Sequence, residues 1–305
     1  MAAAAGIRLT WGDIADIADA VPLLARLYPN GKADVNHFHA AGGTGFLMNT
    51  LLNRGLLHRD VKTAWGISLD HYTQEPFLDS AGKVSWRSAP EASLDENVLR
   101  PAKKPFQETG GLHLLEGPLG CAMVKISALP KERWCVEAPA RVFNSQEEVK
   151  EAFSKGEFTS DVAVVVRLQG PKANGMPELH ALMPILGILQ DRGYTVILVT
   201  DGRLSGASGR VPAALHVTPE AIVPDSPLSK VRDGDIIRVD ALARRLEIVG
   251  ISEVDFLSRS SAPPVEAHNH FGLGRELFGS FRSNVSSAAE GGFSFGKEWF
   301  EGKVQ

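Results

Sequence analysis

The sequence predicts an α/β fold, because it contains amphipathic helices as well as strands with the composition of buried strands. Polar, glycine-containing loops follow two of these strands. These two strands cover residues 162–168 and 194–200, and each is a nearly continuous run of β-branched and apolar residues. Such runs are typical of strands that are buried on both faces. Ligand sites of α/β sheets usually lie at the carboxyl ends of strands, so the two following loops are the first candidates for function.

The length and composition indicate a soluble globular protein with more than one domain. The chain has 305 residues, of which 44% are hydrophobic and 22% charged. A net charge of −4 argues against non-specific binding to nucleic acids or acidic membranes. No apolar run approaches the roughly 18 residues of a membrane span, and the alanine-rich start does not resemble a signal peptide. We therefore expect a cytoplasmic protein without nucleic-acid or membrane partners.

The first part of the chain reads as helical. Apolar residues recur at helical spacing from Ile14 to Tyr28, and Pro22 inside this pattern predicts two short helices instead of one. A further amphipathic helix is predicted over Phe46–Arg54. His37 and His39 are two residues apart and so lie on different faces of a helix. This spacing favours structural roles for the two histidines over metal binding.

From residue 65 the pattern weakens, and four prolines with scattered charges suggest a long connecting segment that ends at a domain boundary near Gly110-Gly111. The chain then becomes rich in strands. Besides the two strands above, strands are predicted over Leu112–Leu115, Ala122–Ala128 and Cys135–Phe143, with a hairpin over 233–240 and 245–249.

Two helices are predicted in this second part. One follows the capping-box sequence that begins at Ser145, and the other covers Pro177–Arg192, with its proline in the first turn and Gly193 at its end. The tail, residues 263–305, is rich in glycine and serine but too aromatic for a disordered segment. We expect it to pack across another surface.

The cysteines exclude some kinds of site. Cys121 and Cys135 are too few for a disulfide framework or for a metal site made of cysteines alone. Each lies in an apolar, strand-like stretch, which favours buried, inert thiols.

The two polar loops carry groups that could bind or transform a ligand. The loop after the second strand contains Asp201 and several glycines. It also contains the guanidinium groups of Arg203 and Arg210 and the hydroxyls of Ser205 and Ser208. A charged surface turn and a ligand-binding loop are about equally compatible with this composition. The loop after the first strand leads to Glu178, which could stabilise a helix start or bind a hard cation. If the two strands are neighbours, both loops meet at one end of the sheet.

The stretches 169–178, 200–210 and 216–221 resemble conserved motifs of the dihydroxy-acid and 6-phosphogluconate dehydratase family. The stretches 28–43 and 274–278 are similar to the phosphogluconate branch, so the resemblance covers nearly the whole chain. Members of this family are about twice as long as this chain. They hold an iron–sulfur cluster with cysteines of an amino-terminal domain.

The resemblance implies a division of the chain. Residues 1–65 would be the end of the amino-terminal domain, a helical remnant of an α/β domain, and residues 66–111 a linker. Residues 112–305 would be the carboxyl-terminal domain, a swivelling β/β/α or barrel-like unit with a packed tail. The implied cofactors are a 4Fe-4S cluster, with ligands expected in the missing amino-terminal half, and possible Mg²⁺ or Mn²⁺. The full-length protein would be a homodimer.

The implied reaction is dehydration of 6-phospho-D-gluconate to 2-keto-3-deoxy-6-phosphogluconate, a step of the Entner–Doudoroff pathway. The resemblance makes Ser205 the base that removes the C2 proton and Glu178 a ligand of a divalent cation. It places Ser208, Lys172, Arg203 and Arg210 against the substrate. We expect the isolated chain to be inactive. The alternatives are a dehydratase for dihydroxy acids or other sugar acids, and a truncated module that folds or binds without catalysis.

Overall fold

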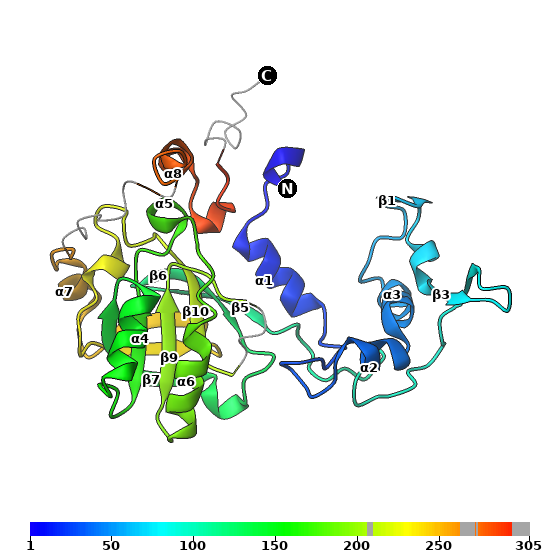
Figure 1. Cartoon of the computed structure of the whole chain (residues 1–305), viewed down its shortest axis with the longest axis horizontal. Coiled ribbons are helices and arrows are strands. Elements are labelled where there is room, and N and C mark those ends of the chain that lie inside the picture. Colours follow the sequence, from blue (N-terminus) through cyan, green and yellow to red (C-terminus); the bar gives the residue numbers. More distant parts are fainter. Residues whose placement is uncertain (206–209, 263–271, 273, 295–305) are drawn as a thin grey trace. The chain divides into compact units, whose positions relative to one another are not determined.

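The structure, a computed structural model, describes residues 1–205, 210–262, 272 and 274–294 (Figure 1). Internal contacts divide the chain into two compact units, each described here by itself. Met1–Ala15 and Leu112–Gln305 form one, which we call the barrel unit, and Asp16–Gly111 form the second unit.

The barrel unit contains a closed barrel of eight strands in the spatial order β10-β6-β5-β12-β11-β7-β8-β9. This result confirms the predicted mixed α/β, barrel-like fold. In chain order the strands are β5 (Leu112–Gly117), β6 (Gly120–Lys125), β7 (Cys135–Phe143), β8 (Val162–Val166), β9 (Val196–Thr200), β10 (Ala213–Thr218), β11 (Ile236–Asp240) and β12 (Arg245–Val249).

The strands β7, β8, β9 and β10 run parallel to one another, and the remaining neighbours are antiparallel except for β12 and β5. The strands β8 and β9 pair directly, from Val162 opposite Val196 to Val166 opposite Thr200. The two polar loops therefore leave the same edge of the sheet side by side, so the condition that the sequence left open, that the two strands are neighbours, is met.

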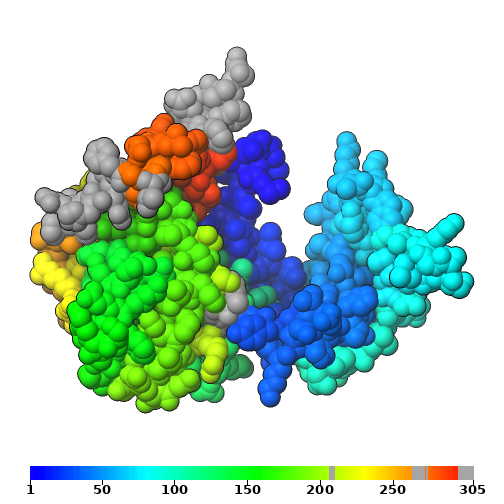
Figure 2. Space-filling view, viewed as in Figure 1, coloured from blue at the N-terminus to red at the C-terminus, as the bar shows by residue number. Residues whose placement is uncertain are grey.

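The apolar runs of β8 and β9 are continuous because each face of these strands packs against a different core. Ala163 and Val165 point into the barrel interior, whereas Val162, Val164 and Val166 pack on the other side. The outer core also contains apolar residues of α4 (Gln146–Ser154) and α6 (Leu182–Asp191). These helices cover the outer face of the parallel strands, and this face of the unit is green in the space-filling view (Figures 1 and 2).

The helix predictions for this unit are partly confirmed. The Ser145 hydroxyl caps α4 by accepting a hydrogen bond from the Glu148 amide (3.2 Å), as the capping box predicts. The prediction of a helix from Pro177 is wrong, because α6 begins only at Leu182. The preceding backbone makes other contacts: Glu178 forms a β-bridge with Arg203, and the Leu179 amide donates to the Arg203 carbonyl (3.2 Å).

Three short helices complete the barrel unit: α5 (Pro171–Asn174), α7 (Glu253–Leu257) and α8 (Gly279–Asn284). The described part of the tail packs as predicted, since Ser286 is fully buried and α8 lies next to α5. The rest of the predicted tail lies outside the described residues.

The second unit begins with the second half of α1 (Trp11–Ala20). It continues with α2 (Val35–Ala40), α3 (Gly43–Asn53), and the hairpins of β1 (Lys62–Thr63) with β2 (Gly66–Ile67) and β3 (Gln74–Leu78) with β4 (Val84–Ser88). The predicted pair of helices over 14–28 is wrong. After α1 the chain is extended, because the Leu23 and Arg26 amides donate to the Gln107 and Val98 carbonyls.

The prediction of two buried thiols is wrong for Cys135. Cys121 is half-buried, but Cys135 is exposed. Residues of β7 alternate in direction, so that Ala138 and Ala140 face the barrel interior while Cys135 and Glu137 face outward. In the part of the chain that the structure describes, no helix combines the length and the apolar character needed to cross a bilayer.

Candidate functional site

The candidate site lies where the segments after β8, β9 and β10 meet. The loop after β8 runs from Arg167 to Glu178, and the described part of the loop after β9 runs from Asp201 to Ser205. A third segment, Pro219–Ala221, follows β10. Because the three strands are parallel neighbours, hydrogen bonds connect these segments at one edge of the sheet.

Asp201 connects all three segments. Its carboxylate is fully buried and accepts hydrogen bonds from the amides of Leu168 (3.1 Å) and Gln169 (2.8 Å) in the first segment and of Ala221 (2.9 Å) in the third. Burial raises the pKa of the Asp201 carboxyl to about 6, although these amide donors act in the opposite direction. Asp201 is thus a positioning group, since its burial keeps it out of contact with a ligand in solution.

Glu220 forms a second connection of this kind. Its carboxylate is buried and accepts hydrogen bonds from the amides of Lys172 (3.0 Å) and Ala173 (3.1 Å). Burial also raises the pKa of this carboxyl. The glycine at 170 is required for this approach, because a Cβ atom there would overlap the Glu220 side chain from its carboxylate to its Cβ.

Glu178 joins the two polar loops through its side chain. Its Oε2 accepts a hydrogen bond from Nη1 of Arg203 (2.9 Å), and its Oε1 accepts one from the backbone amide of Ser205 (2.8 Å). Nε of Arg203 donates to the Met176 carbonyl (2.7 Å), which holds the guanidinium against the loop that follows β8. The side chains of Glu178 and Arg203 are about one-third and one-half exposed, so this ion pair borders on solvent.

His216 is a further group at this edge that the sequence did not single out by itself. It has a positive φ of 59°, its amide donates to the Gly202 carbonyl (3.0 Å), and its ring lies 5.9 Å from the Trp11 ring, measured between centroids. Burial, together with the charge of Arg203, lowers the pKa of His216. The imidazole is therefore neutral at pH 7 and able to accept a proton.

The structure brings some of the predicted site residues together and separates others. Glu178, Arg203 and Ser205 are in direct contact, and Lys172 lies in α5, in the adjoining loop. Arg210 is elsewhere: its guanidinium faces Asp191 (3.7 Å) at the end of α6, and its carbonyl accepts from Arg133. Both partners precede the amino ends of parallel strands, opposite the site edge. Ser208 lies outside the described residues.

The described residues do not form a metal or cluster site by themselves. They contain no group of three or more His, Cys, Asp or Glu side chains placed to hold a metal ion. Both oxygens of Glu178 already accept hydrogen bonds, and Cys121 and Cys135 lie on different strands of the barrel. The described donor set thus does not fit an iron–sulfur cluster. The role of Glu178 as a ligand of Mg²⁺ or Mn²⁺ stays a prediction.

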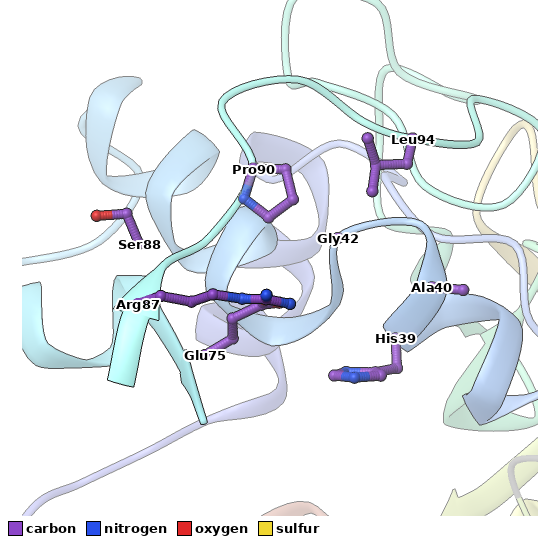
Figure 3. A pocket seen from close by; sticks show the side chains of 8 residues that line it. All are labelled: His39, Ala40, Gly42, Glu75, Arg87, Ser88, Pro90 and Leu94. Atoms are coloured by element: carbon purple, nitrogen blue, oxygen red, sulfur yellow. The ribbon is translucent and has the colours of Figure 1, made fainter. Parts of the chain in front are cut away.

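The second unit has a pocket of its own, with a volume of about 310 Å³ (Figure 3). It lies between the end of α2 and the β3–β4 hairpin, and the ion pair between Arg87 and Glu75 (2.5 Å) forms part of its wall. None of the predicted site residues lines this pocket. Its lining consists of His39, Ala40, Gly42, Glu75, Arg87, Ser88, Pro90 and Leu94.

Comparison with known protein families gives two matches that together cover most of the chain. Residues 97–292 match the model of the dihydroxy-acid/6-phosphogluconate dehydratase carboxyl-terminal domain. Residues 1–72 match the model of the amino-terminal domain of the same dehydratases. The three segments of the candidate site all lie within the first match.

Individual relatives agree with these matches. The chain is 54% identical over 295 residues to a phosphogluconate dehydratase of Pseudomonas aeruginosa, and 52% identical over 291 residues to one of Escherichia coli K12. These alignments cover 97% and 95% of this chain but 48% of each relative. A dihydroxy-acid dehydratase of Caldicellulosiruptor saccharolyticus is 39% identical over 241 residues, which are 77% of this chain and 40% of that protein. The chain thus spans about half the length of the curated relatives it matches.

Proposed function

The chain belongs to the dihydroxy-acid/6-phosphogluconate dehydratase family, and we propose that it supplies the carboxyl-terminal part of a phosphogluconate dehydratase. That enzyme, a hydro-lyase, dehydrates 6-phospho-D-gluconate to 2-keto-3-deoxy-6-phosphogluconate. In the proposed division, residues 1–65 end the amino-terminal domain, 66–111 link the domains, and 112–305 form the carboxyl-terminal domain.

The contact of Glu178 with Arg203 and with the Ser205 amide is the observation that carries this proposal. It joins two loops that are separated by more than twenty residues of sequence, and the Ser205 backbone amide donates to the Glu178 carboxylate. The buried Asp201 carboxylate holds the bases of these loops together. A site of this kind is preorganised, because its polar groups are fixed before a substrate arrives.

In the proposed reaction, the oxygen of Ser205 accepts the C2 proton of the sugar acid. The C2–H electron pair forms the C2–C3 double bond as the C3–O bond breaks, and the departing hydroxide takes up a proton to leave as water. The resulting enol tautomerises to the 2-keto acid. A serine hydroxyl is a weak base, and nearby positive charge is needed to stabilise its alkoxide. Arg203 is the described cation nearest in sequence to Ser205, and we propose that it contributes this stabilisation. Ser208 and Lys172 would contact the substrate, whereas Arg210 is left out because its guanidinium faces Asp191 at the opposite edge of the sheet.

The remaining parts of the proposal rest on family membership. They are a 4Fe-4S cluster with ligands in a part of the enzyme outside this chain, a divalent cation at Glu178, a homodimeric assembly and a cytoplasmic location. Because the described residues do not fit the cluster, no step of the reaction is derived through it.

A chimera tests this function. The chain would replace the matching residues of the Pseudomonas aeruginosa relative, and the 2-keto product would be measured with 6-phosphogluconate and with a branched-chain dihydroxy acid as substrates. We expect turnover of 6-phosphogluconate by the chimera and none by the isolated 305-residue chain. The chain alone should also be colourless.

Two variants of the chimera sharpen the test. Ser205→Ala should lower kcat by a factor of roughly a hundred to ten thousand, the usual contribution of a general base. Ser160→Ala, in an exposed loop of the same unit, is the matched control and should leave kcat unchanged. A folded chimera that prefers the dihydroxy acid, or an isolated chain that is brown and active, would contradict the proposal.

A further inference from the structure

Two arginines of the tail lie against α5 without a carboxylate partner. Nη1 of Arg275 donates to the Asn174 side-chain oxygen (2.9 Å), and Nη2 donates to the Ala173 carbonyl (3.3 Å). Nη2 of Arg282 donates to the Arg275 carbonyl (2.6 Å). All these acceptors are neutral. In the described ranges, neither guanidinium comes within ion-pair distance of an acidic side chain.

Lys172 lies in α5 directly before Ala173, whose carbonyl accepts from Arg275, and its positive charge also acts on the Glu220 carboxylate. Its amide donates to the Glu220 carboxylate, but its ammonium group forms no ion pair with the part of the chain that is described. Both Glu220 oxygens accept hydrogen bonds from backbone amides, so this carboxylate is already engaged. We call Lys172, Arg275 and Arg282 the α5 cation cluster.

The cluster is connected to the candidate site through one side chain. The side-chain oxygen of Asn174 accepts the hydrogen bond from Arg275, and the side-chain nitrogen of Asn174 donates to the Gln169 side-chain oxygen (3.1 Å). The Gln169 backbone amide donates to Asp201, the buried group that holds the loops. An anion at the cluster would therefore lie beside the loop that carries Glu178.

The uncompensated charge of the cluster contrasts with other arginines of the barrel unit. Arg141, Arg203, Arg238 and Arg259 each contact a carboxylate. In the cluster, burial lowers the pKa of Arg275, and the charge of Arg282 lowers it further. In a chain with a net charge of −4, the two neighbouring guanidinium groups have no carboxylate partner among the described residues, and a dianionic ligand would supply the counter-charge.

We propose that the α5 cation cluster binds the phosphate group of a phosphorylated sugar acid. A phosphate monoester carries a charge of about −1.5 to −2 at pH 7, which matches two or three cations better than a carboxylate with a single charge does. Guanidinium groups also suit phosphate oxygens, because they can donate two parallel hydrogen bonds. This proposal rests on the proposed function, since it assigns one end of that substrate.

Calorimetric titration of the full 305-residue chain tests the proposal without catalysis. The probes are 6-phosphogluconate, gluconate and inorganic phosphate. We expect 6-phosphogluconate and inorganic phosphate to bind, and gluconate to bind at least tenfold more weakly. Arg282→Gln should weaken 6-phosphogluconate binding about tenfold, as expected for the loss of one charge-assisted hydrogen bond, and should leave gluconate binding unchanged.

Arg238→Gln is the matched control, because that guanidinium is already neutralised by Glu137 and Glu247. It should not change either affinity. Since Arg275 also holds the tail on α5, Arg275→Gln is compared with Arg282→Gln by hydrogen exchange at the Ser286 amide, which donates to the Phe293 carbonyl. A variant that keeps this protection and loses phosphate affinity supports the proposal.

Equal binding of gluconate and 6-phosphogluconate would overturn the proposal, as would unchanged phosphate affinity in both arginine variants. Neither result depends on the reaction, because no turnover is measured. Conversely, phosphate binding by the chain together with an inactive, folded chimera would refute the proposed function and leave the phosphate site in place.

Discussion

The barrel unit and the second unit differ in how completely they bury their apolar side chains. The barrel unit has one core inside the barrel and another beneath α4 and α6. The core of the second unit contains four buried residues, with a few half-buried neighbours. Its hairpins expose large apolar side chains at the surface, among them Trp65, Ile67, Leu78, Val84 and Trp86.

This difference indicates which unit is stable through the packing of its own residues. A unit that buries both faces of its strands gains stability from its own residues, whereas exposed aromatic clusters are typical of surfaces that another protein part covers. In the second unit the Trp65 and Trp86 rings pack edge to face with centroids 4.3 Å apart, yet both remain more than 40% exposed. The candidate site lies entirely in the barrel unit.

The largest expected effect is a difference in hydrogen exchange. Amides of β8 and β9 should exchange only through global unfolding of the barrel, whereas amides of α3 should exchange through local opening of the second unit. We expect at least a thousandfold difference in protection, which corresponds to about 4 kcal/mol. Equal protection of α3 and β9 in a monomeric sample would remove the contrast between the two units.

A pair of core truncations should separate the units next. Leu186, which is fully buried in α6, packs in the outer core of the barrel unit, and Leu186→Ala should lower its free energy of unfolding by about 2–5 kcal/mol. Phe46→Ala should destabilise the second unit and leave β9 protection unchanged. Urea titrations combined with hydrogen exchange would measure both effects. A loss of β9 protection in Phe46→Ala would mean that the two units unfold together.

The buried Asp201 should make the stability of the barrel unit depend on pH. Burial raises its folded pKa to about 6 from an ordinary value of 3.8, so its stabilising contribution is complete below pH 4 and is lost as the pH rises through 6. The difference of about two pKa units corresponds to about 3 kcal/mol. The charged groups that act on it are Glu220, which opposes its ionisation, and Arg167.

Urea unfolding of the wild-type chain and Asp201→Asn at pH 4 and pH 7 checks this prediction. Relative to the variant, the wild-type chain should lose about 2 kcal/mol between the two pH values, because the unfolded carboxyl is already partly ionised at pH 4. Asp235→Asn is the matched control, because Asp235 has an arginine partner that compensates its charge. A pH-independent difference between wild type and Asp201→Asn would show that Asp201 keeps an ordinary pKa.

The smallest expected effect concerns association. Exposed apolar side chains of the hairpins favour self-association, so Trp86→Ser should reduce self-association of the isolated chain several-fold in analytical ultracentrifugation. The control Leu242→Ser, at an exposed position of the barrel unit, should not reduce it. A monomeric wild-type chain at high concentration would show that the exposed apolar surface of the second unit does not drive association.

Much of the barrel was predictable because its elements carry local signals. The runs at 162–166 and 196–200, the cap at Ser145 and the hairpin near 240 each contain a periodicity or a turn that is visible within a few residues. The sequence left open whether the two strands are neighbours, and only the direct pairing of β8 with β9 shows that the two polar loops are adjacent.

Long-range contacts explain what was missed. Nothing local to Asp201 reveals that its carboxylate is fully buried against amides at 168, 169 and 221, and nothing local to Arg275 places it on Asn174. The start of α6 was misplaced for a related reason, because Glu178 pairs with Arg203 far along the chain. The exposure of Cys135 depended on which face of β7 turned inward.

The central claim is that the loops after β8 and β9 form a dehydratase site with Ser205 as its base. Exchange of the C2 proton of 6-phosphogluconate in deuterated water, measured by NMR with the chimera and its Ser205→Ala variant, tests this claim most directly. We expect exchange in the chimera and its loss in Ser205→Ala, with substrate affinity near normal. Exchange at an unchanged rate in Ser205→Ala would contradict it, and would make the neutral His216 the group to test instead.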